Sequence, residues 1–421
     1  MRPALKTRVG TFLASVGSLP GAPSRRSTAV VLLGIDFGTA CTRALRWDGV
    51  ADLAPRIVVV PSVALAQASG FVVGEAAAAR LGEQAPAVVY GLKRLLERAP
   101  DDRVAREVAR RGGAKLLLAE QQLTLRTAAG LSVGVDGCVA ALLHQAATRA
   151  AGPDATGVRP AVLALAEWYD ADQEATLREA ARRAGIHVMR FIGDGVAAAL
   201  WAAKDDPSER TLAVVNVGAG GTSVTIVSID PQGVYLSSAA SDRSWGGDDV
   251  TASLVGAILA KAPMLPAQQP GLRETLRQAV EAMKPDLARG TAASRTVRIA
   301  TPVGTGDALV GLEQADLPRA MQGLLTAIGE TAAEALDQAE MTAQEIDQVL
   351  ALGGMGAFGP VLGRIAEAFG QAPAVGQELE QHVVLGAAYE AAILADQAEG
   401  PLVLDGKSTG SIALAGPSTL S

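Results

Sequence analysis

The first candidate for chemistry is a short polar turn that interrupts an apolar run. The run ends at Asp36, passes Gly38 and Thr39, and resumes as a strand-like stretch at 41–47. This order is typical of a tight hairpin whose backbone N–H groups point outward. Because such N–H groups can bind an anion, we expect this turn to hold a phosphate group, although Asp36 read alone could simply cap the turn.

A second turn of the same kind lies far downstream. An apolar run over 212–217 contains Asn216, passes through the glycine-rich stretch 218–221, and resumes as a strand at Thr222. Two such turns indicate two homologous lobes that present phosphate-binding hairpins to one cleft. The sequence therefore predicts a duplicated nucleotide-binding fold.

Alternating strands and helices must position these turns. Apolar strands are expected at 160–166, 187–192 and 348–352, and two long amphipathic helices at 171–184 and 317–339. This succession predicts an α/β fold with mixed, largely parallel sheets covered by helices. Further helices are expected at 76–82, 88–98, 103–111, 131–151, 196–204, 272–288, 361–369 and 380–395.

Composition shifts divide the chain into four expected segments. Residues 1–28 are basic and rich in Ser, Gly and Pro, which predicts a flexible arm or, as the alternative, a transit-type leader. Lobe I is expected at 29–208, with 380–397 returning to it, and lobe II at 209–379. The Gly-, Ser- and Thr-rich end, 398–421, is expected to be a linker-like disordered tail.

Composition and charge exclude several classes of protein. Of the 421 residues 49% are hydrophobic, enough for two or three domains, and no apolar run is long enough to cross a membrane. A net charge of −7 without a Lys/Arg stripe argues against a nucleic-acid partner. Cys41 and Cys138 make no disulfide framework, and the three histidines have no metal-ligand spacing. We therefore expect a soluble cytoplasmic protein.

Several motifs, in order, resemble the nucleotide-binding domain of the heat shock protein 70 chaperones, within the actin and sugar-kinase ATPase superfamily. The resemblance covers roughly residues 30–395. It implies two duplicated ribonuclease H-like lobes, the actin-like ATPase fold, around a central nucleotide cleft. The matching stretches are 34–39, 60–63, 73–74, 92–95, 192–200, 216–226, 245–249, 281–284, 352–354 and 385–388.

The resemblance also implies a ligand and roles for single residues. The cleft would hold ATP or ADP with a magnesium ion, which Asp36 would face through water. Lys93 would lie by the terminal phosphate and the attacking water, and Asp194 stands where the family has a Glu that holds the metal-bound water network. Nucleotide contacts are implied for Gly38, Thr39, Ala40, Gly218, Gly220, Gly221, Thr222, Glu281, Lys284, Gly353 and Gly354.

Most of these residues also have a purely structural interpretation. Read alone, Lys93 is a solvated surface charge and Asp194 is the N-cap of a helix. Glu281 and Lys284 suit an ordinary exposed helix face. The flanking motif matches favour ligand contact for Lys93, whereas the two interpretations of Asp194 stay open.

The chain departs from the family pattern at positions that bear on hydrolysis. Asn216 replaces an Asp, which removes one of two carboxylates facing each other across the metal and leaves a weak contact through water. Gly221 stands in place of a Thr, Ala357 in place of an Arg that stacks on adenine, and Ala288 in place of a Ser that contacts the base. These changes predict slow hydrolysis and weaker or altered nucleotide binding.

Four functions compete on this fold. The first hypothesis is an ATP-binding chaperone-like protein with weak ATPase activity, whose partners are co-chaperone or client proteins. Residues 402–405 resemble the family's interdomain linker, but too few residues follow for a peptide-binding domain, so a chaperone role would be indirect or would use the lobes. The second hypothesis is a non-catalytic nucleotide-gated switch or scaffold. A small-molecule kinase and an actin-like filament are less favoured.

Overall fold

The computed structural model describes residues 31–49, 56–67, 70–81, 88–96, 102–111, 115–119, 122–126, 130, 132–153, 155–266, 269, 271–301, 304–376 and 378–404. The described residues belong to one compact unit that begins at Val31. The arm expected at 1–28 lies outside the described residues. Within the described residues, no helix is both long and apolar enough to cross a bilayer.

The first five-stranded sheet has the order β11-β10-β1-β2-β3. Its central strand β1 (Leu33–Phe37) is buried along its whole length, as its nearly uninterrupted apolar sequence indicates. β1 runs parallel to β10 (Arg159–Leu165) and antiparallel to β2 (Cys41–Arg46). The sheet is completed by β3 (Val58–Pro61) and β11 (Ile186–Gly193). The polar turn follows the C-terminal end of β1, so it lies at the end of the central strand of the sheet.

The second five-stranded sheet, β17-β12-β13-β14-β18, repeats this arrangement. Here β12 (Arg210–Val217) runs parallel to β17 (Gln348–Leu352) and antiparallel to β13 (Thr222–Asp230). The next strands are β14 (Gly233–Asp242) and β18 (Leu402–Leu404). The same parallel and antiparallel pairing around β1 and β12 confirms the predicted duplicated α/β fold.

The end of the chain differs from expectation. Disorder was expected from residue 398, yet β18 pairs in parallel with β14. Val403 is 5% exposed and joins a buried cluster, and this burial together with the pairing to β14 favours an ordered segment. Residues 405–421 lie outside the described residues.

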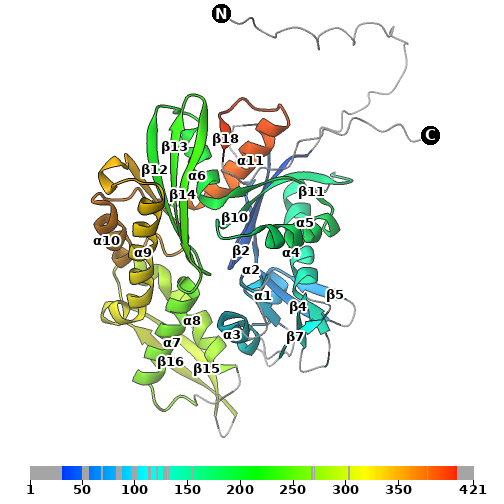
Figure 1. Cartoon of the computed structure of the whole chain (residues 1–421). Coiled ribbons are helices and arrows are strands. Elements are labelled where there is room, and N and C mark those ends of the chain that lie inside the picture. Colours follow the sequence, from blue (N-terminus) through cyan, green and yellow to red (C-terminus); the bar gives the residue numbers. More distant parts are fainter. Residues whose placement is uncertain are drawn as a thin grey trace, which may run out of the picture. The chain divides into compact units, whose positions relative to one another are not determined.

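Helices cover both sheets (Figure 1). α9 (Leu317–Gln338) lies along the face of β13 and β14, and α10 (Gly359–Phe369) packs against α9. α6 (Asp194–Ala203) and α11 (His382–Leu394) share one buried cluster with residues of both sheets. The remaining α-helices are α1 (Glu75–Ala78), α2 (Leu92–Leu95), α3 (Arg103–Arg111), α4 (Val135–Ala151), α5 (Ala171–Arg183), α7 (Gly247–Lys261) and α8 (Leu272–Ala288).

Small sheets accompany the two large ones. β15 (Ala293–Thr301) and β16 (Gly304–Leu312) form a two-stranded sheet. The order β5-β4-β6 comprises β5 (Gly70–Val73), β4 (Val63–Gln67) and β6 (Val88–Tyr90), and the order β7-β8-β9 comprises β7 (Lys115–Ala119), β8 (Gln122–Arg126) and β9 (Ser132–Gly134).

The helix expected at 88–98 was wrong in its first part. Residues 88–90 form β6 and pair with β4, because the β-branched Val88 and Val89 and the aromatic Tyr90 suit a pleated sheet surface. Gly91 then adopts φ 68°, a left-handed conformation that favours glycine, and α2 is only one turn long. This strand, turn and short helix set the position of Lys93.

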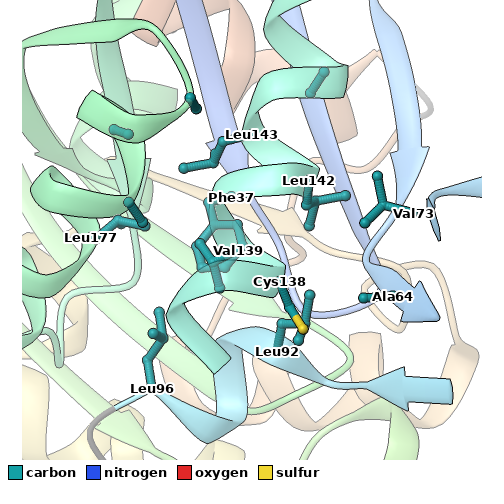
Figure 2. Close-up of a cluster of buried hydrophobic side chains, with 14 of the residues drawn as sticks. Phe37, Ala64, Val73, Leu92, Leu96, Cys138, Val139, Leu142, Leu143 and Leu177 are labelled. Carbon is teal, nitrogen blue, oxygen red and sulfur yellow. The ribbon is translucent and has the colours of Figure 1, made fainter. Parts of the chain in front are cut away.

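A buried cluster fixes α2 against the first sheet (Figure 2). Side chains from α4, among them Cys138 and Leu142, pack against Leu92 of α2 and Phe37 of β1. Burial raises the pKa of the Cys138 thiol to about 12, so this cysteine is a neutral core residue. Because the core holds α2 and the end of β1 together, the side chains that leave both elements share one region.

Candidate functional site

A cavity of about 950 Å³ opens among the ends of these elements. Both hairpin turns, α2, the start of α6, α8 and the end of β17 contribute to its wall. All but one of the residues proposed from sequence line it, namely Asp36, Gly38, Thr39, Ala40, Lys93, Asp194, Asn216, Gly218, Gly220, Gly221, Glu281, Lys284, Gly353 and Gly354. A volume of this size suits a nucleotide.

The two hairpin turns touch one another. A Cβ added to Gly220 would collide with the hydroxyl of Thr39, so only glycine allows this approach. Thr222 is the one proposed residue that does not line the cavity. It is fully buried, and its hydroxyl donates to the backbone carbonyl of Trp245 at 3.1 Å, which braces the second turn from behind.

Lys93 and Asp194 form a buried ion pair at the cavity wall. Lys93 Nζ lies 3.6 Å from Asp194 Oδ2, and the two side chains are 6% and 7% exposed. The hydroxyl of Tyr169 donates to the Lys93 carbonyl at 3.3 Å, and its ring centroid lies 5.9 Å from Lys93 Nζ. The solvated-charge interpretation of Lys93 is therefore wrong, since the side chain is held inside.

Asp36 has a partner that sequence reasoning missed. Arg43 stands directly opposite Asp36 in the pairing of β2 with β1, and its Nη1 donates to Asp36 Oδ2 at 3.2 Å. Arg43 Nη2 also lies 3.8 Å from Glu380 Oε2. Burial acts to lower the pKa of Arg43, but the charge of Asp36 leads the opposing effects and the net shift is upward. The signal that could have identified this pair is the position of Arg43 in the predicted hairpin, where it lies opposite Asp36 on the same face of the sheet.

Glu281 and Lys284, two of the residues proposed as nucleotide contacts, are bonded to each other in the cavity lining. Lys284 Nζ donates to Glu281 Oε1 at 2.9 Å and to the Gly247 carbonyl at 3.0 Å. Glu281 also accepts from the hydroxyl of Thr251 at 2.5 Å. Ala288 and Ala357 also line the cavity. These two positions, at which the chain differs from the family pattern, therefore lie where a nucleotide base could contact them.

Glu167 is a second residue that sequence reasoning missed. Its Oε1 accepts from the Gly195 N–H at 2.7 Å and from the Thr225 hydroxyl at 3.0 Å. Its Oε2 is buried, and no hydrogen-bond partner for it is found among the described residues. The carboxylate thus caps the first turn of α6, where an anion is favoured, and fixes the residue next to Asp194. No local motif in the sequence marks this role.

Polar contacts link α7 and α8 to β6 and α2 beside the cavity. The Tyr90 hydroxyl donates to Asp248 Oδ2, and Arg94 Nη2 donates to Asp249 Oδ2 at 3.3 Å. Arg277 Nη2 donates to the Asp248 carbonyl at 3.2 Å. Burial raises the pKa of Asp249, with the charge of Arg94 as the main opposing effect.

The comparisons with known proteins agree with this geometry. The family model described as Hsp70 protein matches residues 32–415. The chain belongs to the Hsp70 family. This confirms the resemblance and the fold class expected from the motifs, and proteins of this family in general bind ATP or ADP with Mg²⁺.

Curated relatives are chaperone proteins described as HscA homologs. The chain is 30% identical over 386 residues to the protein from Bordetella petrii, which covers 89% of this chain and 59% of that protein. It is 30% identical over 393 residues to the protein from Verminephrobacter eiseniae, covering 90% and 61%, and 28% identical over 393 residues to that from Burkholderia mallei, covering 90% and 60%. The chain thus spans about three fifths of the length of these relatives.

The side chains near the phosphate turns do not fit a strongly held magnesium ion. Asp36 is paired with Arg43 and Asp194 with Lys93, while Asn216 carries no charge. In the part of the chain that the structure describes, no group of three or more His, Cys, Asp or Glu side chains could hold a metal ion. At a nucleotide site Mg²⁺ is bound by one or two carboxylates together with the phosphates, and here both nearby carboxylates are already paired with cations.

Proposed function

We propose that the chain binds ATP or ADP in this cavity, closes its two lobes around the nucleotide and hydrolyses ATP slowly. The lobe boundaries at 29–208 with 380–397, and at 209–379, are part of this proposal. The observation that carries it is the meeting of both hairpin turns with Lys93 and Asp194 at one cavity wall. Membership of the Hsp70 family supports a nucleotide as the ligand.

In this proposal the two turns bind the polyphosphate, and the Lys93–Asp194 ion pair acts at its terminal phosphate. Backbone N–H groups at 38–41 and 219–221 bind phosphate oxygens from two sides. Lys93 donates to the terminal phosphate or orients a water beside it, while Asp194 holds the ammonium in place. No step is assigned to a metal ion, because the side chains present do not fit one.

Slow turnover follows from the charges at the site. Asn216 offers an amide where a carboxylate would attract a divalent cation beside the transferring phosphoryl. Asp194 is already engaged by Lys93, so it is a poor base for the attacking water. In this proposal ATP therefore stays bound for a long time before it is hydrolysed.

Calorimetry and single-turnover hydrolysis test the proposal together. We expect ATP to bind wild type, Lys93→Ala to lower the single-turnover rate about 100-fold, and Asn216→Asp to raise the rate when Mg²⁺ is present. Lys261→Ala is the matched control, because Lys261 pairs with Asp316 and lies outside the cavity; its rate should equal that of wild type. Absence of ATP binding with and without Mg²⁺ would contradict the proposal.

A nucleotide-gated switch without hydrolysis is the second candidate. The observations that favour it are the neutral Asn216 and the Arg43–Asp36 ion pair, which both reduce free negative charge near the phosphates. In this case ATP would bind and remain intact over a long incubation, and Lys93→Ala would change affinity only. Turnover that disappears in Lys93→Ala would eliminate this candidate.

The partner and location follow as further parts of the proposal. The relatives are named chaperones, so we propose that client or co-chaperone proteins contact the lobes, and that the protein acts in the cytoplasm, where its free thiols at Cys41 and Cys138 suit a reducing medium. Suppression of aggregation of a denatured test protein, with and without ATP, checks the client role. An unchanged aggregation rate under both conditions would contradict it.

A further inference from the structure

The cavity contains a cation of its own beside the carboxylate that would face a metal. Asp36 and Arg43 are cross-strand partners, so their side chains leave the same face of the first sheet. Both side chains line the cavity, and Arg43 remains 24% exposed. The guanidinium is therefore reachable by a ligand that enters the cavity.

Arg43 has more N–H donors than its two acidic neighbours use. A guanidinium carries five N–H donors, and in this structure Nη1 serves Asp36, while Nη2 only approaches Glu380, at 3.8 Å. Its planar fork matches the oxygens of a phosphate, and such contacts are among the stronger hydrogen bonds in proteins. The two acidic neighbours keep the guanidinium in place without using all of its donors.

The charges around the phosphate turns reinforce this. Asp36 is paired there with Arg43 and Asp194 with Lys93, Glu380 also approaches Arg43, and Asn216 is neutral. A polyphosphate entering the cavity would meet cations already built into the wall. A divalent ion would have to compete with Arg43 for Asp36.

We propose that Arg43 takes over part of the charge neutralisation of the nucleotide's polyphosphate, so that nucleotide binding depends only weakly on a divalent cation. This inference rests on the proposed nucleotide-binding function. It deepens that function by naming the bound form as the metal-free nucleoside di- or triphosphate. The competing possibility is that Arg43 only anchors Asp36 and Glu380 to each other.

Nucleotide titrations in excess EDTA and in excess Mg²⁺ test the inference. Using a fluorescent ADP analogue, we expect the wild-type Kd to differ by less than about threefold between the two conditions. Arg43→Gln should weaken binding in EDTA by about tenfold or more, and Mg²⁺ should restore much of the loss. Arg43→Lys keeps the charge without the fork and should fall between the two.

Arg56→Gln is the matched control. Arg56 is 51% exposed, pairs with Asp48 and lies outside the cavity, so its removal changes net charge alone and should leave both Kd values at the wild-type level. Wild-type binding that requires Mg²⁺ would overturn the inference and leave the proposed function standing. Absence of nucleotide binding in both conditions would overturn both. An Arg43→Gln Kd in EDTA equal to that of wild type would show that Arg43 only anchors its acidic neighbours, and Arg43→Lys provides this comparison if Arg43→Gln fails to fold.

Discussion

At the scale of single residues, the buried carboxylate of Glu167 explains how Asp194 keeps its place. Asp194 begins α6, and its neighbour Gly195 donates its N–H to Glu167 at 2.7 Å. The same oxygen of Glu167 accepts from Thr225 in the second sheet at 3.0 Å. Glu167 thereby ties the start of α6, and with it the Lys93–Asp194 pair, to β13. It is a positioning residue, because it does not itself line the cavity.

We expect Glu167→Ala to lower the single-turnover rate of ATP hydrolysis by about tenfold while the nucleotide Kd stays within about twofold of wild type. The reason is that Lys93 and Asp194 lose their fixed orientation, whereas the phosphate turns remain. Glu167→Gln should recover most of the rate, because an amide oxygen still accepts from Gly195 and Thr225. Equal loss in both variants, or a Kd that changes as much as the rate, would argue against a positioning role.

At the scale of elements, a buried ion pair connects three segments that are distant in sequence. Arg190 on β11 donates through Nη1 to Glu390 Oε1 on α11 at 2.8 Å and through Nη2 to the Val403 carbonyl on β18 at 2.9 Å. The side chains of Arg190 and Glu390 are 10% and 2% exposed. Arg190 therefore links β18 to strand β11 of the first sheet and to helix α11.

Glu390→Ala should lower the free energy of unfolding by about 3 to 5 kcal/mol, because it removes the carboxylate that pairs with the buried Arg190 guanidinium. Urea denaturation measures this change. Glu179→Ala is the control, since Glu179 pairs with Arg182 on an exposed helix face, and it should produce a much smaller change. Similar losses in the two variants would show that the buried pair has no special structural role.

Strong, local sequence signals were sufficient for much of the fold. The strand expected at 348–352 matches β17, and the helix expected at 171–184 matches α5 to within one residue, because both are uniform in period and bounded by clear signals. The helix expected at 88–98 failed because tertiary pairing with β4 overrides the local period at Val88 and Val89. β16 was missed because its exposed, Gly-containing sequence has little apolar alternation.

The candidate site was less accessible to sequence reasoning than the fold. Glycine turns and Asp36 could be proposed because their residue types follow strand ends. Arg43 could have been proposed from the residue alternation of the hairpin, which sets it opposite Asp36. Glu167 could not, because its partner Gly195 lies on another element. Whether these residues contact a nucleotide remains a prediction.

At the scale of the whole molecule, the central claim is that two hairpin turns from duplicated halves bind one polyphosphate. Both turns line the same cavity, and Gly220 of the second approaches Thr39 of the first closely. A ligand that contacts both turns would protect their backbone N–H groups together. A ligand bound elsewhere in the cavity would not.

Hydrogen exchange of the full chain, with and without saturating ADP, measures this most directly. We expect slower exchange on ADP addition at 38–41 and at 219–221 together, with no comparable change in the exposed strands β15 and β16, which lie outside the cavity. Slower exchange at one turn alone, or at neither turn while ADP is bound, would contradict a shared polyphosphate site.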